Sequence, residues 1–240
     1  MQPRQKNILK AVIREYSRRG EPVSSLMLAK KYGLDFSTAT IRGEMMRLER
    51  KGYLSQPHTS AGRVPTDKGL RFFVDELMDK VILIERERRI FQEYVNRFIS
   101  EQHQLLRGAA KALARVSRNL GFGLLPEDQS FYGAGYADLL KSWGEENYEE
   151  ATQMFDALEH SPEKKLIRVF KEMNTGIQVF VGGENPIVEF KNCGLIVASS
   201  PVSEDERVFI GIMGPRKMDY AKNYSLVSEL AEWFEKRIKT

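Results

Sequence analysis

The chain has 240 residues, of which 42% are hydrophobic and 29% charged, a composition typical of a soluble globular protein with one large or two modest domains. The single cysteine excludes an internal disulfide framework and fits a reducing compartment. No apolar run approaches the roughly 18 residues that a transmembrane helix needs, and the polar N-terminus is not typical of a signal peptide. We therefore expect a cytoplasmic protein with no membrane partner.

The formal net charge of +4 hides an asymmetry between the two halves of the chain. Residues 1–120 hold 24 Lys and Arg against 13 Asp and Glu, a net charge of +11, whereas residues 121–240 hold 13 against 20, a net charge of −7. A basic N-terminal half joined to an acidic C-terminal half is typical of a nucleic-acid binder with a separate regulatory part.

Three helices are expected at the start of the chain. The first spans about Pro3–Arg19 and begins with a proline, which suits the first helical turn. Ser24 or Ser25 can cap a second helix, and Gly33 suits the left-handed position of the turn that follows it. Ser37 can cap a third helix. Two helices joined by a tight turn are typical of a helix-turn-helix module.

The third helix has an apolar stripe of Ile41, Met45 and Leu48 and ends before Gly52. Its opposite side carries small residues, which let the backbone approach base edges, and two arginines, Arg47 and Arg50, which can reach phosphates. Arg42 flanks the apolar stripe and could donate two hydrogen bonds to a guanine. The alternative is an ordinary surface helix with three arginines. The candidate DNA-binding residues of this helix are Ser37, Thr38, Ala39, Thr40, Arg42, Gly43, Arg47 and Arg50.

Residues 53–55 and 63–65 are predicted to form two short strands joined by a loop. A hairpin directly after a recognition helix is the wing of a winged-helix domain. The loop is rich in hydroxyl-bearing and small residues, so it can lie along the DNA backbone or reach the minor groove with Arg63. A solvated turn is the alternative. The candidate DNA-binding residues of the wing are His58, Thr59, Ser60 and Arg63.

Thr66 can cap a short helix, and residues 84–120 then carry an apolar stripe at spacings of three and four that is interrupted at Gln102. This pattern predicts one long helix, either a coiled-coil seam or a bundle helix, that supplies part of a homodimer contact. A dimer would match the two halves of an inverted repeat. We expect a DNA-binding domain in residues 1–80, a linking and dimerisation helix in residues 81–120 and a regulatory domain in residues 121–240.

The C-terminal segment is predicted to be α+β, and Gly121, Gly123 and Pro126 are interpreted as its boundary. Ser161 can cap one of its helices. Strands are expected over residues 130–136, 177–181, 187–190, 195–199 and 208–213, and helices over residues 148–158, 162–173 and 220–238.

The C-terminal segment shows no catalytic or metal-binding constellation, so we expect no enzyme, metal or cofactor. Residues 182–185 lack the lysine of a P-loop and are more consistent with a turn, and Cys193 with a buried structural thiol. The acidic run over residues 145–150 lacks the histidine or cysteine of a transition-metal site. Residues 214–220 place two cations before a helix N-terminus, which leaves an anion site open as a hypothesis.

Residues 37–78 contain the runs ATIR, GYL and QPHTSAGRVPTDKG, and this stretch resembles the heat-inducible transcription repressor family (HrcA). The runs VFVGGENPIVEF and FIGIMGPRKMDYAK, in the C-terminal half, resemble the same family. Gly43 and Glu44 stand where the family has Asn-Asp. The family also has a longer stretch with an inserted dimerisation segment before the strand near Phe131, where this chain has about ten residues, 121–130.

The resemblance implies a repressor of heat-shock genes whose winged helix binds a CIRCE-type inverted-repeat operator in double-stranded DNA. It also implies a C-terminal domain similar to GAF-type sensory domains, trimmed in this chain, and regulation through the GroEL chaperonin. Such a protein would be cytoplasmic and nucleoid-associated. Two alternatives stay open. One is a small-molecule-gated winged-helix regulator of other genes, which a pocket with convergent polar groups in the C-terminal domain would favour; the other is an enzyme with an accessory DNA-binding module.

Overall fold

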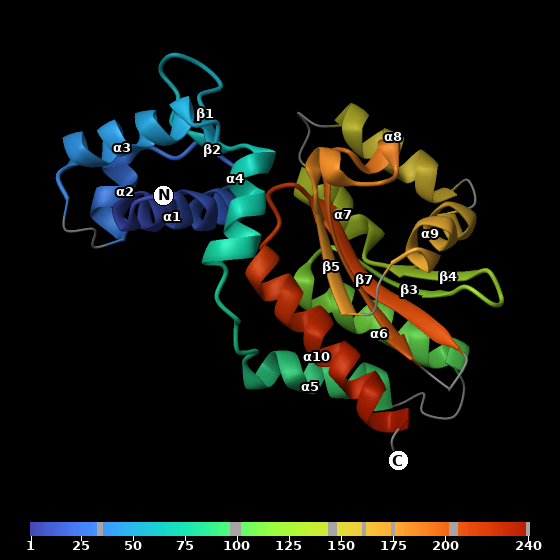
Figure 1. The fold of residues 1–240 in the computed structure, drawn as a ribbon. Coiled ribbons are helices and arrows are strands. Elements are labelled where there is room, and N and C mark those ends of the chain that lie inside the picture. The colour runs from blue at the N-terminus through green and yellow to red at the C-terminus, as the bar shows by residue number, and fades with distance from the viewer. Residues whose placement is uncertain are drawn as a thin grey trace. The chain divides into compact units, whose positions relative to one another are not determined.

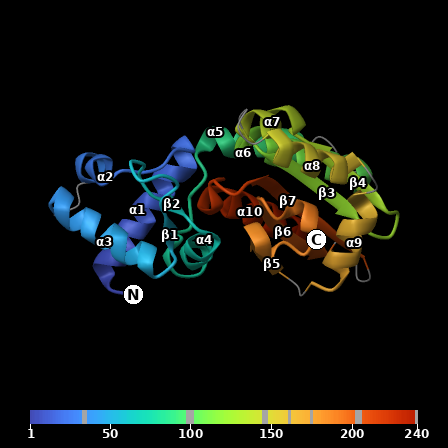
Figure 2. The ribbon, with the colours of Figure 1, turned by 90° about the horizontal axis from the view of Figure 1, so that it is seen from above.

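The computed structural model describes residues 1–32, 36–96, 102–143, 148–159, 162–173, 176–201 and 206–238. The chain divides into two compact units, Met1–Asp79 and Lys80–Thr240, which Figures 1 and 2 draw from two directions. The turn predicted at Gly33, the cap predicted at Ser161 and part of the acidic run, residues 145–147, lie outside the described residues.

The N-terminal unit consists of three helices, a hairpin and a short fourth helix. The two strands of the hairpin pair antiparallel, with Leu54 opposite Pro65. The fourth helix continues into a π-helical turn, Phe73–Leu77. The elements are α1 (Pro3–Arg19), α2 (Ser25–Lys31), α3 (Thr38–Arg50), β1 (Leu54–Ser55), β2 (Val64–Pro65) and α4 (Asp67–Phe72).

Hydroxyl side chains begin three of these helices, as the sequence predicts. Ser24, Ser37 and Thr66 each accept a hydrogen bond from the backbone N–H three residues further on, at 3.2, 3.1 and 3.1 Å. Of the two serines before α2, Ser24 is therefore the cap. At the end of α3, Gly52 has a φ of 77°, the left-handed conformation that favours glycine.

The apolar stripes of α1 and α3 pack together in the core of the N-terminal unit. Ile8 and Val12 of α1 are fully buried, as are Ile41 and Leu48 of α3. Burying one stripe of each helix turns the opposite side of α3 towards solvent. Other buried members of this core are Leu9, Ile13, Leu28, Met45, Leu54, Leu70 and Phe73.

The C-terminal unit is built on a five-stranded antiparallel sheet with the strand order β4-β3-β7-β6-β5. The α+β fold class predicted from the sequence is confirmed. The strands predicted over residues 177–181, 195–199 and 208–213 are all present. The strands are β3 (Leu120–Leu125), β4 (Ser130–Ala134), β5 (Gly176–Val181), β6 (Cys193–Pro201) and β7 (Arg207–Pro215).

Helices cover both faces of this sheet (Figures 1 and 2). One face packs against α6 and α10, and α5 packs on α6. On the other face, side chains of α7, α8 and α9 join alternate residues of the strands in one hydrophobic cluster, which includes Phe122, Phe170 and Phe209. The helices are α5 (Glu85–Asn96), α6 (Gln102–Ser117), α7 (Tyr136–Trp143), α8 (Tyr148–Glu159), α9 (Pro162–Lys171) and α10 (Tyr220–Ile238).

The prediction of a single helix over residues 84–120 is wrong. Ile90 of α5 and Val116 of α6 line the same hollow, whereas a straight helix would place them about 39 Å apart. Leu120 already belongs to β3. A period of three and four residues predicts helical conformation but does not show whether one helix continues or a second helix folds back on the first.

Two further predictions about the C-terminal unit are corrected. Gly121 and Gly123 are not a boundary but lie in β3, where α6 packs directly on the strand: a Cβ on Gly121 would lie 2.3 Å from the carbonyl oxygen of Ala110. Where a strand was predicted over residues 187–190, Val188–Phe190 form a 3-10 turn, and the buried residues Ile187 and Phe190 are accordingly spaced by three. The helix α7 was not predicted from the sequence.

Candidate nucleic-acid interface

The solvent-facing side of α3 carries the residues that the sequence proposed for DNA contact. Arg42, Arg47 and Arg50 are exposed, while Thr38, Thr40 and Gly43 are half-buried. Ser37 and Ala39 are exposed at the start of the helix. The helix therefore presents small side chains at its N-terminal end and guanidinium groups further along, the arrangement that a recognition helix needs in a major groove.

The three arginines of α3 differ in their partners. Arg47 donates a hydrogen bond to Glu44 at 2.7 Å. Arg42 and Arg50 have no hydrogen-bond or ion-pair partner among the residues that the structure describes. Two guanidinium groups on this face are thus available for phosphates or base edges.

Glu44 lies on the inner side of α3, and its side chain is 2% exposed. A hydrogen bond from Gln5 of α1, at 2.9 Å, holds the pKa of Glu44 below its ordinary value, and the positive charges of Arg47 and Arg4 act in the same direction. Burial opposes the shift. At the neighbouring position, a Cβ added to Gly43 would meet nothing within 4 Å. Glu44 therefore anchors the helix, whereas Gly43 has open space beside it.

The wing, residues 53–65, is closed at its tip by one side chain. The Gln56 amide nitrogen donates to the carbonyl oxygens of Thr59 at 2.9 Å and Ala61 at 3.0 Å. These two bonds fix the backbone of the loop, and the side chains of His58, Thr59 and Ser60 are exposed around it. Sequence reasoning did not identify Gln56 as an organiser of the wing, although the residue lies within the motif that carries the family resemblance.

Arg63 lies at the base of the wing and not at its tip. Its side chain is 15% exposed, and Nε and Nη2 both lie 2.9 Å from a carboxylate oxygen of Glu49 in α3. The backbone of Arg63 exchanges hydrogen bonds of 2.9 and 2.8 Å with Val23, which precedes α2. Arg63 therefore fastens the wing to α3 and to the segment that leads into α2.

A hollow of about 400 Å³ separates α3 from the wing. It brings together Arg42, Thr59, Ser60 and Arg63, four of the residues that the sequence singled out. Arg47, Arg50 and His58 do not line it. Its remaining walls include Met46, Gln56, Gly62 and the start of α2.

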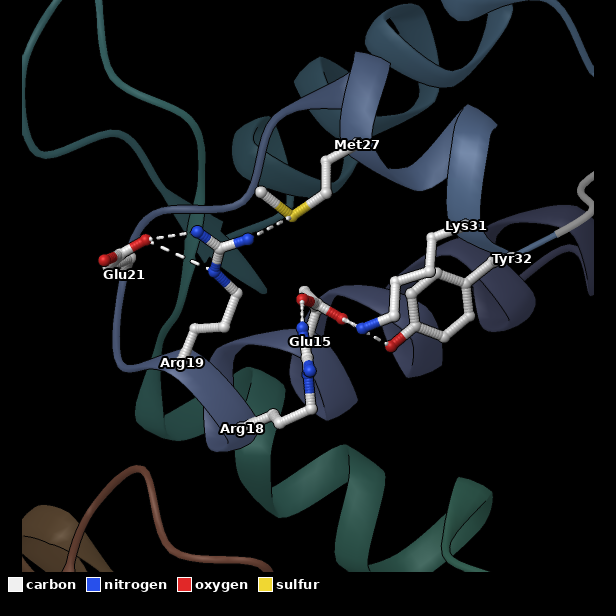
Figure 3. A network of polar contacts seen from close by, with 7 residues as sticks. All are labelled: Glu15, Arg18, Arg19, Glu21, Met27, Lys31 and Tyr32. Atoms are coloured by element: carbon white, nitrogen blue, oxygen red, sulfur yellow. Dashed lines mark hydrogen bonds and ion pairs between the residues drawn. The ribbon is translucent and has the colours of Figure 1, made fainter.

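A polar network that the sequence analysis did not predict ties α2 to α1 (Figure 3). Glu15 is fully buried and accepts hydrogen bonds from Arg18 at 2.7 Å, Lys31 at 2.5 Å and Tyr32 at 3.0 Å. Burial alone would raise the pKa of Glu15, but these bonds outweigh it and lower the pKa to about 2. The sequence signal was an acidic residue in the region of the apolar stripe of α1.

The C-terminal features considered for chemistry have structural roles. Asn185 donates to the carbonyl oxygens of Gly182 at 2.8 Å and Cys193 at 2.9 Å, which closes the predicted turn. Cys193 is buried, and burial raises the pKa of its thiol. Asp219 accepts from the backbone N–H of Lys222 at 3.1 Å, so the start of α10 already has a carboxylate.

Within the ranges that the structure describes, no three His, Cys, Asp or Glu side chains gather in a way that could hold a metal ion. Over the same residues, no helix combines the length and the apolar character that crossing a membrane requires.

The fold and the site define a winged helix-turn-helix protein with an α+β second unit. Residues 68–223 match the family model of the HrcA protein C-terminal domain, and residues 1–62 match that of the LexA DNA-binding domain. Because the first match spans more than half of the chain, this protein belongs to the HrcA family.

Individual relatives agree with this assignment. The heat-inducible transcription repressor HrcA of Syntrophobacter fumaroxidans is 44% identical over 124 residues, which cover 52% of this chain and 36% of that relative, so this match spans about a third of the relative's length. The protein of the same name from Natranaerobius thermophilus is 26% identical over 323 aligned positions, covering 95% of this chain and 94% of that relative. A crystal structure described as that of a hypothetical protein shares the fold, with a TM-score of 0.74 at 20% identity over 99% of this chain and 98% of that chain.

Proposed function

We propose that this chain is a sequence-specific transcription repressor of heat-shock genes that binds a CIRCE-type inverted-repeat operator through its winged helix. One observation carries the proposal: Arg42 of the recognition helix α3, unpaired among the described residues, lies around one hollow with Thr59 and Ser60 of the wing. Membership of the HrcA family and the names of the relatives support the role in the heat-shock response.

The proposed DNA-binding residues have different roles. Arg42 reads a base, because an exposed guanidinium on a recognition helix can donate two hydrogen bonds to guanine. Arg50 and Arg47 contact phosphates, as do the backbone and hydroxyl groups of Ser37, Thr38 and Thr40 at the N-terminus of α3. Ala39 and Gly43 allow close approach to base edges. His58, Thr59 and Ser60 lie along the backbone of the DNA, and Arg63 holds the wing in position.

The same proposal includes partners and location. An inverted repeat has two equivalent halves, so we propose a homodimer that presents two winged helices. The family resemblance supports the GroEL chaperonin as a partner that regulates the repressor. The protein would act in the cytoplasm at the nucleoid, would need no cofactor and would catalyse no reaction.

The test is binding of the purified protein to a labelled CIRCE duplex and to a scrambled duplex, followed by fluorescence anisotropy at several salt concentrations. We expect preferential binding to CIRCE, and Arg42→Ala should cost about 1–3 kcal/mol of operator binding and relax specificity at one base pair. Arg89→Ala removes the same charge from α5, in the other unit, and should leave both duplexes unaffected.

Equal binding of the wild-type protein to both duplexes, with the same steep loss of affinity as salt rises, would contradict the proposal. Such behaviour would show only counterion release from the phosphate backbone. An equal effect of Arg42→Ala on both duplexes would contradict base recognition by Arg42 and leave it a phosphate contact.

A further inference from the structure

A second hollow, of about 590 Å³, lies entirely within the C-terminal unit. It is bounded by α5, by the C-terminal end of α6 and by Lys222 of α10. Its volume falls within the range of about 300–1,000 Å³ that is usual for small-molecule sites. The turn at residues 182–185 and the start of α10 at Asp219, considered above, do not line it.

Cations predominate on its walls. Arg86, Arg115, Arg118 and Lys222 face two carboxylates, Glu87 and Glu93. Lys222 and Glu87 neutralise each other in an ion pair of 2.5 Å. The hollow therefore keeps an excess of positive charge after this pair is formed.

Two of the guanidinium groups have no competing partner among the described residues. Arg86 and Arg115 make no hydrogen bond or ion pair with any residue in the described part of the chain. Arg118 approaches only a carboxylate oxygen of Asp138 among those residues, at 3.9 Å. Planar guanidinium groups without carboxylate partners are well suited to bidentate bonds with phosphate oxygens.

The position of Arg118 is unusual for an arginine. It directly follows α6, donates its backbone N–H to Ala114 at 3.0 Å and has a φ of 59°. Glycine or asparagine normally occupies this left-handed position after a helix. The chain thus places a cation at the rim of the hollow despite a backbone conformation that disfavours its side chain.

Apolar and aromatic groups complete the walls. Ile90 and Tyr94 of α5 and Val116 of α6 lie beside the cations. A ligand that fits would combine a charged oxyanion with a flat or apolar body, as a nucleotide does. We propose that this hollow binds a small phosphorylated molecule of nucleotide size, with its phosphates on Arg86 and Arg115 and its body along Ile90 and Tyr94. The residues that line this hollow are all different from those proposed to bind DNA.

Isothermal titration of the full chain with ADP and with pyrophosphate, at about 150 mM salt to screen long-range attraction, tests the proposal. We expect both probes to bind. The double variant Arg86→Gln with Arg115→Gln should weaken binding by about tenfold or more, because it removes charge-assisted hydrogen bonds. The matched control, Arg89→Gln with Lys111→Gln, removes the same charge from the same two helices at exposed positions outside the hollow.

Three outcomes would overturn the site: no heat from either probe, binding that the first double variant leaves unchanged, or equal weakening by both double variants, which would indicate general charge attraction. Circular dichroism checks that both variants fold. If the first is misfolded, the single charge reversal Arg115→Glu replaces it, with Lys111→Glu as its control. Because no DNA is present, the result does not depend on operator binding.

Discussion

Arg63 and Glu49 join the wing of this protein to its recognition helix, with Nε and Nη2 of the arginine both 2.9 Å from the same carboxylate oxygen. Both side chains are partly shielded from solvent, which strengthens the attraction between them relative to an exposed pair. The backbone of Arg63 also pairs with Val23. Arg63 therefore connects the wing to α3 through its side chain and to the segment before α2 through its backbone.

If Arg63 acts by positioning the wing, its removal and the removal of its partner should have the same effect. Glu49→Gln and Arg63→Ala should each weaken operator binding by about 1 kcal/mol, and the double variant by little more than either single change. Anisotropy titrations with the CIRCE duplex measure this double-mutant cycle. A large loss for Arg63→Ala with no loss for Glu49→Gln would instead show that the arginine contacts DNA directly.

Gly43 offers a stability test of the recognition helix. A Cβ at this position meets nothing within 4 Å, and the residue lies in the interior of α3. Gly43→Ala should therefore stabilise the N-terminal unit by about 0.5–1 kcal/mol, since alanine loses less backbone entropy on forming a helix. Urea unfolding followed by far-UV circular dichroism measures the change.

The matched control for this prediction is Gly52→Ala. This glycine also has open space, with only the Lys68 side chain near 4 Å, but its φ is 77°. The same methyl group should destabilise here by about 1–2 kcal/mol because the left-handed conformation disfavours a Cβ. If both substitutions changed the free energy of unfolding in the same direction, the explanation from backbone conformation would be contradicted.

The buried carboxylate of Glu15 should make the stability of the N-terminal unit depend on pH. Its pKa in the folded protein, about 2, is lower than its ordinary value of 4.5. The charged form is thus favoured by folding, so its contribution is fully present above about pH 4.5 and is lost as pH falls towards 2. Glu15→Gln should be less stable than the wild type at pH 7, and the difference should shrink at pH 3.

Urea midpoints at pH 7, 5 and 3 give this comparison. Glu21→Gln is the control, because Glu21 belongs to the neighbouring pair with Arg19 but is exposed (Figure 3). An exposed pair contributes at most about 1 kcal/mol, so this variant should follow the wild type at every pH. A difference between Glu15→Gln and wild type that stays constant from pH 7 to 3 would exclude the proposed shift.

The features predicted correctly from the sequence depend on near neighbours in the chain. Ser37 and Thr66 cap helices through backbone groups three residues away, so their residue types and spacing were sufficient, whereas the choice between Ser24 and Ser25 needed the structure. The features that were missed depend on distant partners. Nothing in the sequence near Arg63 indicates that Glu49, on the preceding helix, holds its guanidinium, and nothing near Glu15 indicates Lys31.

The same distinction explains the errors in the C-terminal unit. The stripe along α5 and α6 is a local pattern and correctly indicates helix, but the reversal between them is set by how each helix packs. Gly121 carries no side chain whose character could reveal a buried strand. The need for glycine at this position is visible only in the three-dimensional structure, where α6 packs across the strand.

Gly121 therefore provides the last prediction. A methyl group there would lie 2.3 Å from the carbonyl oxygen of Ala110 and 2.7 Å from the backbone nitrogen of Ala114, so α6 would have to move away from β3. Gly121→Ala should destabilise the C-terminal unit by about 1–3 kcal/mol or more.

Gly123→Ala is the graded control. Its nearest contacts, around Leu106, are at 3.1 Å, so this substitution should destabilise the unit less. Both tryptophans, Trp143 and Trp233, lie in this unit, so their fluorescence during urea unfolding reports on it alone. Equal costs at the two glycines would contradict direct packing of α6 on the backbone at Gly121.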